Sequence, residues 1–252
     1  MKSLLKEISS YWSTRTEGYS QVNQKELEGI QKQAWFEVLQ QQFPEKPKEQ
    51  LKILDIGTGP GFFPSILAEA GYWVNAVDYT ESMLKKAKEN TRKFKDRVCL
   101  EKMDAQNLTF LDETFDVIIS RNLTWNLEQP EKAYREWYRV LKPNGILLNF
   151  DANWYGYLYD PEKRSAYETD RKNVKDNKME DHYLCTDIDW MEQIALQMPL
   201  SALERPKWDE SVLKEVGFLN VQVEPEIWKQ VWSVEEKINY QSTPMFMIMA
   251  VK

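Results

Sequence analysis

A glycine-rich stretch followed by a spaced acid is the pattern in this chain that could most directly do chemistry. The segment LKILDIGTGPG places Asp55 before three alternating glycines, Gly57, Gly59 and Gly61. Glycines in such a loop let the backbone turn sharply and lie against a small molecule. Asp78 follows about twenty residues after the first glycine, where a carboxylate can accept hydrogen bonds from both hydroxyl groups of a ribose. The pattern therefore predicts a site for a ligand that contains a nucleoside.

The glycine spacing argues against a dinucleotide. The dinucleotide fingerprint G-x-G-x-x-G, counted from Gly57, requires a glycine at position 62, and the chain has Phe62 there. A pyrophosphate-binding loop, and with it a nicotinamide-dependent oxidoreductase, is disfavoured.

The segments around the loop alternate between strand and helix patterns. Short apolar runs predict buried parallel strands, at 51–56, 72–77, 98–103, 115–120 and 146–150. Amphipathic stretches between them predict helices, at 62–70, 80–90 and 130–141, the last stopped by Lys142-Pro143-Asn144-Gly145. Residues 46–151 therefore predict a doubly wound α/β sheet, whose ligands collect at the carboxyl ends of the strands.

The flanking segments differ from this alternation. Residues 1–45 predict an N-terminal helical segment, with an amphipathic helix at 24–43. Residues 152–206 hold clustered rings and charges without a clear strand, and we expect a helical lid inserted after the fifth strand. Residues 207–252 return to the core pattern, with a helix at 208–216 and two strands, at 218–224 and 245–251.

The chain resembles the class I S-adenosylmethionine-dependent methyltransferases, in particular the small-molecule enzymes of the ubiquinone- and menaquinone-biosynthesis type. The resemblance rests on the glycine loop, on Asp55 and Asp78, and on a further acid at a strand end, Asp104. The resemblance implies a Rossmann-like, doubly wound sheet of seven strands, mostly parallel with an antiparallel last strand. It implies S-adenosylmethionine as the cofactor and S-adenosylhomocysteine as the product. The core would be 46–151 and 207–252, and the N-terminal segment would close over the cofactor.

The resemblance also implies which residues hold the cofactor. Met83 would touch the adenine, Asp104 would lie near the adenine amino group, and the amide of Ala105 would face a ring nitrogen. Trp12 and Tyr19 would close over the cofactor, or would equally well be packing residues. The full set of expected cofactor residues is Tyr11, Trp12, Tyr19, Asp55, Gly57, Thr58, Gly59, Gly61, Asp78, Tyr79, Met83, Asp104, Ala105, Arg121 and Asn122.

Methyl transfer needs no covalent nucleophile on the protein, because the acceptor attacks the methyl group in line with the breaking carbon–sulfur bond. The protein must mainly hold the acceptor in place and exclude water. His182, the single histidine, has a pKa suited to a general base. Asp151, Tyr155 and Arg121 are candidates for orienting the acceptor, and Arg121 would suit a carboxylate.

We expect a small-molecule acceptor with a nitrogen or oxygen nucleophile. Two alternatives stay open: a protein that binds S-adenosylmethionine without turnover, and a C-methyltransferase of quinone-type substrates. An aminopropyltransferase would need acids after the fourth strand, where the chain reads Arg121-Asn122-Leu123.

Composition limits the partners. The net charge is −7 and no basic tract stands out, so a nucleic-acid partner is not expected. The two cysteines, Cys99 and Cys185, lack zinc-ligand spacing and are too few for a disulfide framework or a metalloid methyltransferase, so no metal is expected. Neither a signal peptide nor a membrane span is recognisable, and we expect a soluble cytoplasmic protein.

Overall fold

The sheet organises the computed structural model, which describes residues 4–183 and 186–252. Its strands are β1 (Lys52–Ile56), β2 (Trp73–Asp78), β3 (Val98–Lys102), β4 (Phe115–Arg121), β5 (Leu141–Asp151), β6 (Leu219–Glu224) and β7 (Phe246–Val251). They lie in the order β3-β2-β1-β4-β5-β7-β6. Strands β1 to β5 pair in parallel, and β7 pairs antiparallel with both β5 and β6. The predicted sheet, with its antiparallel last strand, is confirmed.

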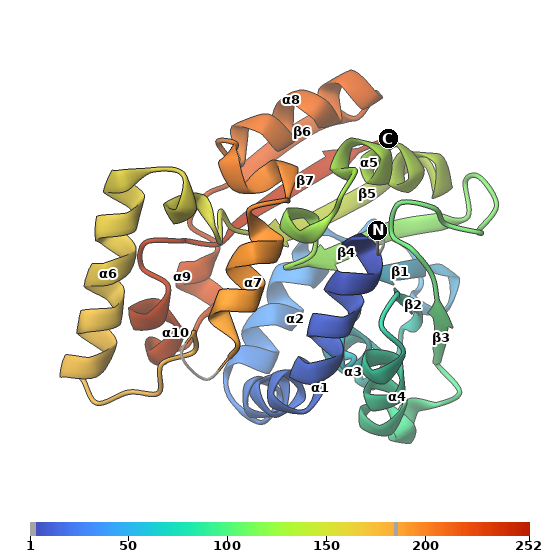
Figure 1. Ribbon diagram of the computed structural model, residues 1–252. Helices are drawn as coiled ribbons and strands as arrows, with labels where there is room; N and C mark the ends of the chain where they lie inside the picture. The colour runs from blue at the N-terminus through green and yellow to red at the C-terminus, as the bar shows by residue number, and fades with distance from the viewer. Residues whose placement is uncertain (1–3, 184–185) are drawn as a thin grey trace.

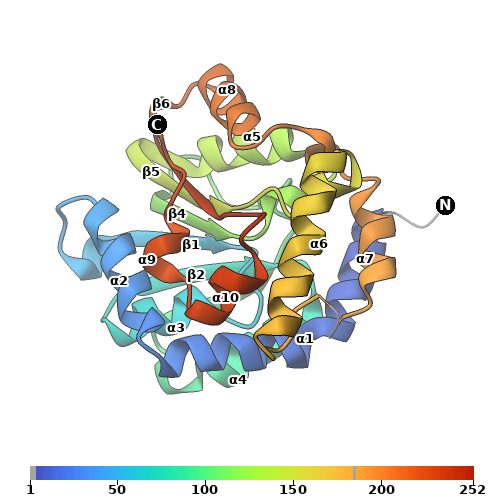
Figure 2. The ribbon, with the colours of Figure 1, turned by 90° about the vertical axis from the view of Figure 1, so that its left-hand side faces the viewer.

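Helices cover both faces of the sheet (Figures 1 and 2). One face packs against α2 (Gln31–Gln42) and α3 (Phe62–Glu69), with Trp35 and Leu67 fully buried. The other face packs against α5 (Pro130–Val140) and α8 (Lys207–Val216), with Trp137 fully buried. Helix α4 (Glu81–Asn90) follows β2 and contacts both β2 and β3.

A third apolar cluster lies outside these two faces. Helices α6 (Pro161–Asp176) and α7 (Ile188–Ala195) come from the segment after β5, and their buried rings and aliphatic groups pack with Ile8 and Tyr11 near the N-terminus. Two short helices near the C-terminus, α9 (Trp228–Val231) and α10 (Val234–Asn239), follow β6, and α10 contacts α6. Figure 2 shows α6, α7 and α10 grouped beside the sheet.

Two boundary predictions were wrong. Helix α1 runs from Leu4 to Glu28, and the chain breaks near Gly29 before α2, whereas we predicted one helix at 24–43. The buried residues of α1 recur every three to five residues, because one face packs on α4 and α7. Strand β5 begins at Leu141, so residues 142–145 belong to the strand, with an irregularity opposite Phe115 and Val117, rather than to a helix stop.

Within residues 4–183 and 186–252, no helix is long and apolar enough to cross a membrane. The same residues contain no group of three or more histidine, cysteine or acidic side chains that could hold a metal ion.

Candidate active site

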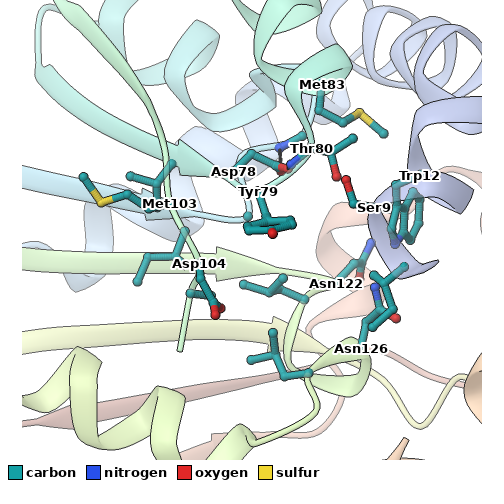
Figure 3. Close-up of a pocket in the computed structure, with 18 of the residues that line it drawn as sticks. Ser9, Trp12, Asp78, Tyr79, Thr80, Met83, Met103, Asp104, Asn122 and Asn126 are labelled. Atoms are coloured by element: carbon teal, nitrogen blue, oxygen red, sulfur yellow. Dashed lines mark hydrogen bonds between the residues drawn. The ribbon is translucent and has the colours of Figure 1, made fainter. Parts of the chain in front are cut away.

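A cleft with about 750 Å³ of empty space lies at the carboxyl ends of β1, β2 and β4. Its floor is the loop after β1, one side is the turn from β2 into α4, and α1 crosses over it. Figure 3 shows Asp78 and Thr80 on one side, Asp104 further along, and Trp12, Asn122 and Asn126 on the side of α1. Parallel strands bring these loops together because all their carboxyl ends meet at one edge.

Two of the glycines form the floor of the cleft. Gly57 has φ +72 and Gly59 has φ +54, both in the left-handed region that glycine adopts without strain. The amide N–H of Gly57 donates to the carbonyl of Val77 at 2.9 Å, which fixes the loop against β2. A Cβ on Gly57 would lie 2.8 Å from the side chain of Leu123, another residue of the cleft.

Gly61 is not part of the cleft lining. It starts α3 with φ +88, and a Cβ there would lie 3.2 Å from the backbone of Ala87. Its absent side chain therefore lets α3 approach α4, and the expected cofactor contact of Gly61 stays a prediction.

Asp78 projects into the cleft with both carboxylate oxygens already oriented. Oδ2 accepts the N–H of Gly59 at 2.9 Å, and Oδ1 accepts the N–H of Thr80 at 2.7 Å. Burial raises the pKa of this carboxyl group, and the two N–H groups act in the opposite direction. The Thr80 hydroxyl and the Tyr79 N–H also interact with this carboxylate and lower its pKa, so a ligand hydroxyl group would share its oxygens with them.

The next part of the cleft, after β2 and β3, is lined mostly by apolar side chains. Tyr79, Met83, Asp104 and Ala105, four of the expected cofactor residues, all line it. Asp104 Oδ1 accepts the backbone N–H of Gln106 at 2.9 Å, which holds the turn after β3. Sequence reasoning missed ten other lining residues, namely Leu5, Ile8, Ser9, Ile56, Val77, Thr80, Met103, Leu123, Asn126 and Leu127. The signal that could have found the first three is the helical periodicity from Leu4 onward.

A small recess continues from the loop toward the other end of the cleft, and its lining includes Asp55, Thr58, Asn23 and Arg121. Burial raises the pKa of Asp55 to about 7, with repulsion from the Asp78 carboxylate adding to the effect. An ammonium group placed here would favour the charged form of Asp55 and lower its pKa.

Arg121 extends toward the same recess. Its Nη2 donates to Glu26 at 2.8 Å, and its guanidinium lies 4.3 Å from the centre of the Phe62 ring. Its buried Nε and Nη1 have no hydrogen-bond partner in the described part of the chain. Buried donors of this kind are costly unless a ligand satisfies them. Arg121 therefore points to an anionic ligand group beside the glycine loop. It does not line the chamber described next, where we expected it to orient an acceptor.

A second cavity, the ring-lined chamber, adjoins the cleft and holds about 650 Å³ of empty space. Trp12, Tyr19 and Asn122 line both cavities, so the two meet at these residues. Its other lining residues are Tyr11, Arg15, Trp125, Trp154, Tyr155, His182, Tyr183, Thr186 and Tyr240. Tyr11 thus lines the chamber and not the cleft, although its neighbour Trp12 lines both.

Two catalytic candidates, Tyr155 and His182, lie in the chamber wall. Burial raises the pKa of the Tyr155 hydroxyl well above its ordinary value, so it is a neutral hydroxyl group. His182 Nδ1 lies 3.0 Å from the Tyr240 hydroxyl. Cys99 is exposed on β3, away from both cavities, and Cys185 lies outside the described residues.

Asp151 does not reach either cavity, so it cannot orient an acceptor by contact. Its side chain is fully buried and pairs with Arg205 at 2.9 Å. Oδ2 accepts the backbone N–H of Trp125 at 3.0 Å, and Oδ1 accepts the indole N–H of Trp154 at 3.0 Å. Asp151 therefore fixes Trp125 and Trp154, two residues of the chamber wall, without lining the chamber itself.

The fold is a doubly wound α/β sheet with a cleft at the strand ends and an adjoining ring-lined chamber. Residues 54–149 match the family model described as a methyltransferase domain. The chain is 32% identical over 132 residues to the ubiquinone/menaquinone biosynthesis C-methyltransferase UbiE of Roseobacter denitrificans, covering 51% of this chain and 52% of that one. It is 36% identical over 104 residues to the malonyl-[acyl-carrier protein] O-methyltransferase of Erwinia pyrifoliae, covering 41% of this chain and 38% of that one.

A solved structure supports the same assignment at the level of the fold. It is the phosphoethanolamine N-methyltransferase 2 of Haemonchus contortus in complex with S-adenosyl-L-methionine, with a TM-score of 0.60, 20% sequence identity, and coverage of 87% of this chain and 52% of that one. The chain covers between 38% and 59% of the length of the first curated relatives that it matches. Over residues 54–149 the chain is therefore similar to known methyltransferases, in agreement with the resemblance carried by its glycine loop and spaced acids.

Proposed function

We propose that this protein is an enzyme that transfers a methyl group from S-adenosylmethionine to a nitrogen or oxygen atom of a small molecule. The observation that carries the proposal is the meeting of the two cavities at Trp12, Tyr19 and Asn122. A nucleoside held on Asp78 extends along the glycine loop toward this junction, and the ring-lined chamber opens from its other side.

The residues of the cleft suit each part of the cofactor. Asp78 would accept the ribose hydroxyl groups, since it lines the cleft at the end of β2 and the N–H groups of Gly59 and Thr80 orient its two oxygens. Asp55 would face the ammonium group of the methionyl end, and the unpaired donors of Arg121 would face its carboxylate. When bound, S-adenosylmethionine supplies a methyl group made electrophilic by the positive charge on sulfur.

The chamber suits the acceptor. Its rings form an apolar wall that excludes water, and such walls also attract cationic or flat groups by about 0.5–2 kcal/mol each. Trp125 and Tyr155 lie with their ring centres 4.9 Å apart, which gives one side of the chamber a fixed shape. We assign residues 1–45 to covering the cofactor and residues 152–206 to holding the acceptor. Helix α1 lines the cleft, and Trp154, Tyr155 and His182 line the chamber.

Asp78 tests the cofactor site. Hydrogen bonds to a charged acceptor contribute about 1.5–3 kcal/mol each, so Asp78→Ala should weaken S-adenosylhomocysteine binding about a hundredfold. Calorimetry measures the dissociation constant, and Asp112→Ala is the control because that carboxylate is 73% exposed and pairs only with Arg139 in the described part of the chain. A loss of less than about threefold for Asp78→Ala would remove the assignment.

Turnover needs a separate assay. The protein is incubated with radiolabelled methyl donor and pooled small metabolites, divided into amines, hydroxyl compounds, thiols and carbon acids. Transfer to an amine or hydroxyl pool supports the proposal. Transfer only to a carbon acid favours a C-methyltransferase of quinone-type substrates, and cofactor binding without transfer to any pool favours a binding protein.

A further inference from the structure

A histidine, a tyrosine and a glutamate form a connected chain in the wall of the ring-lined chamber. His182 Nδ1 lies 3.0 Å from the Tyr240 hydroxyl oxygen, and His182 Nε2 lies 3.6 Å from Glu235 Oε1 on α10. The backbone N–H of His182 donates to Asn239 Oδ1 at 3.1 Å, which fixes the residue against the end of α10. His182 and Tyr240 both line the chamber.

The groups around Tyr240 and His182 determine which atoms of the two side chains carry protons. Burial raises the pKa of Tyr240 well above its ordinary value, so its hydroxyl keeps a proton to donate. His182 is faced by Glu235 from α10, by Glu180 from the preceding turn and by Arg171 from α6; burial lowers its pKa despite the two acids. A neutral imidazole with its Nε2–H toward Glu235 presents an unprotonated Nδ1 to Tyr240.

The rings hold Tyr240 in place. Its ring packs edge to face against Trp154, with centres 5.3 Å apart, and tilts against Trp232 at 5.6 Å. Trp154 is itself held through its indole N–H by Asp151. Packing of the ring therefore fixes the direction of the Tyr240 hydroxyl group, which lies within hydrogen-bonding distance of His182 Nδ1.

We propose that Tyr240 and His182 are the proton-accepting pair of this site, with Glu235 as a positioning residue, and that the methyl acceptor attacks through a nitrogen or oxygen that carries a hydrogen. This inference rests on the proposed methyl transfer. The attacking atom forms its bond to the methyl carbon while the carbon–sulfur bond breaks and its electron pair stays on sulfur. The hydrogen of the attacking atom passes to the Tyr240 oxygen as the Tyr240 proton passes to His182 Nδ1. Glu235 stabilises the resulting imidazolium.

The protonation state can be measured without an acceptor, because the chain has a single histidine. Nitrogen-15 NMR on the protein, free of any histidine tag, reports which ring nitrogen carries the proton. We expect protonated Nε2 and unprotonated Nδ1 near pH 7.5, and a titration of the imidazole below its usual pKa of about 6.5. In Glu235→Gln the histidine pKa should fall further, whereas Glu226→Gln, an exposed carboxylate paired with Lys229, should leave it unchanged. A proton on Nδ1 would overturn the proposal, because that nitrogen could not accept one.

Kinetics with the acceptor found in the metabolite assay completes the test. His182→Gln and Tyr240→Phe should each lower kcat by about 10²–10⁴-fold with the S-adenosylhomocysteine dissociation constant unchanged, and the acid limb of the wild-type kcat/KM profile should disappear in His182→Gln. An active wild type with an equally active His182→Gln refutes only the proton-accepting pair. A wild type that binds the cofactor but methylates no acceptor refutes the proposed function instead.

Discussion

Asp55 offers the sharpest test of how the cofactor is held. The residue is 2% exposed, and its pKa of about 7 means that its carboxyl group carries a proton in about half of the ligand-free molecules at pH 7. An ammonium group bound beside it favours the carboxylate and pulls its pKa down. Binding of S-adenosylhomocysteine at pH 7 should therefore release about half a proton, and binding at pH 9 should release almost none from this group.

The release is measured by calorimetry in two buffers of different ionisation enthalpy, phosphate and Tris. The apparent binding enthalpy at pH 7 should differ between the buffers in proportion to the released protons. Because the pKa of Asp78 is also raised, Asp55→Asn identifies the source: its binding heats at pH 7 should be nearly independent of the buffer. Equal heats in both buffers for the wild-type protein would refute the reasoning.

The same shift affects the stability of the ligand-free protein. The folded pKa of about 7 exceeds the ordinary value of 3.8, so the stability that this group contributes is fully present below the lower value and is lost as the pH rises through 7. The difference corresponds to at most about 4 kcal/mol. Asp55→Asn, which keeps the volume, should therefore unfold at higher urea concentration than the wild type at pH 8, and the advantage should shrink toward pH 4. A constant difference across this range would contradict the raised pKa.

Two further substitutions test the loop and the network behind the chamber. Gly57→Ala should weaken S-adenosylhomocysteine binding at least about tenfold, because the added Cβ displaces a side chain of the cleft. The control is Gly71→Ala, at a position with φ +98 and open space around it. This substitution should lower the free energy of unfolding by only about 1–2 kcal/mol and leave binding unchanged. Arg205→Met leaves two buried carboxylates unpaired and should lower the free energy of unfolding in urea by about 3–5 kcal/mol, whereas Lys207→Met, an exposed ion-pair partner, should change it by less than about 0.5 kcal/mol. Binding unchanged in Gly57→Ala, or equal stabilities in the two methionine variants, would contradict these assignments.

The sequence pattern was sufficient to predict those features that depend on residues close together in the chain. A buried strand, a turn that requires positive φ and an acid at the end of the next strand each depend on neighbouring residues, so β1, the glycine loop and Asp78 could be predicted from spacing. The same reasoning gave the seven strands, because strand and helix periodicities differ. The N-terminal segment was predicted as helical, but its division into α1 and α2 near Gly29 was not.

The acceptor side was decided by tertiary structure. Tyr11, Trp125, Tyr155, His182 and Tyr240 meet in one chamber although they are spread over most of the chain, and no local pattern places them together. Asp151 was predicted as a site residue from its position at the end of a strand. Only the fold shows that its carboxylate forms an ion pair with Arg205, 54 positions later in the chain. Local periodicity fixes which backbone elements form. Which side chains face a cavity depends on how distant segments pack, and short-range spacing carries little information about that packing.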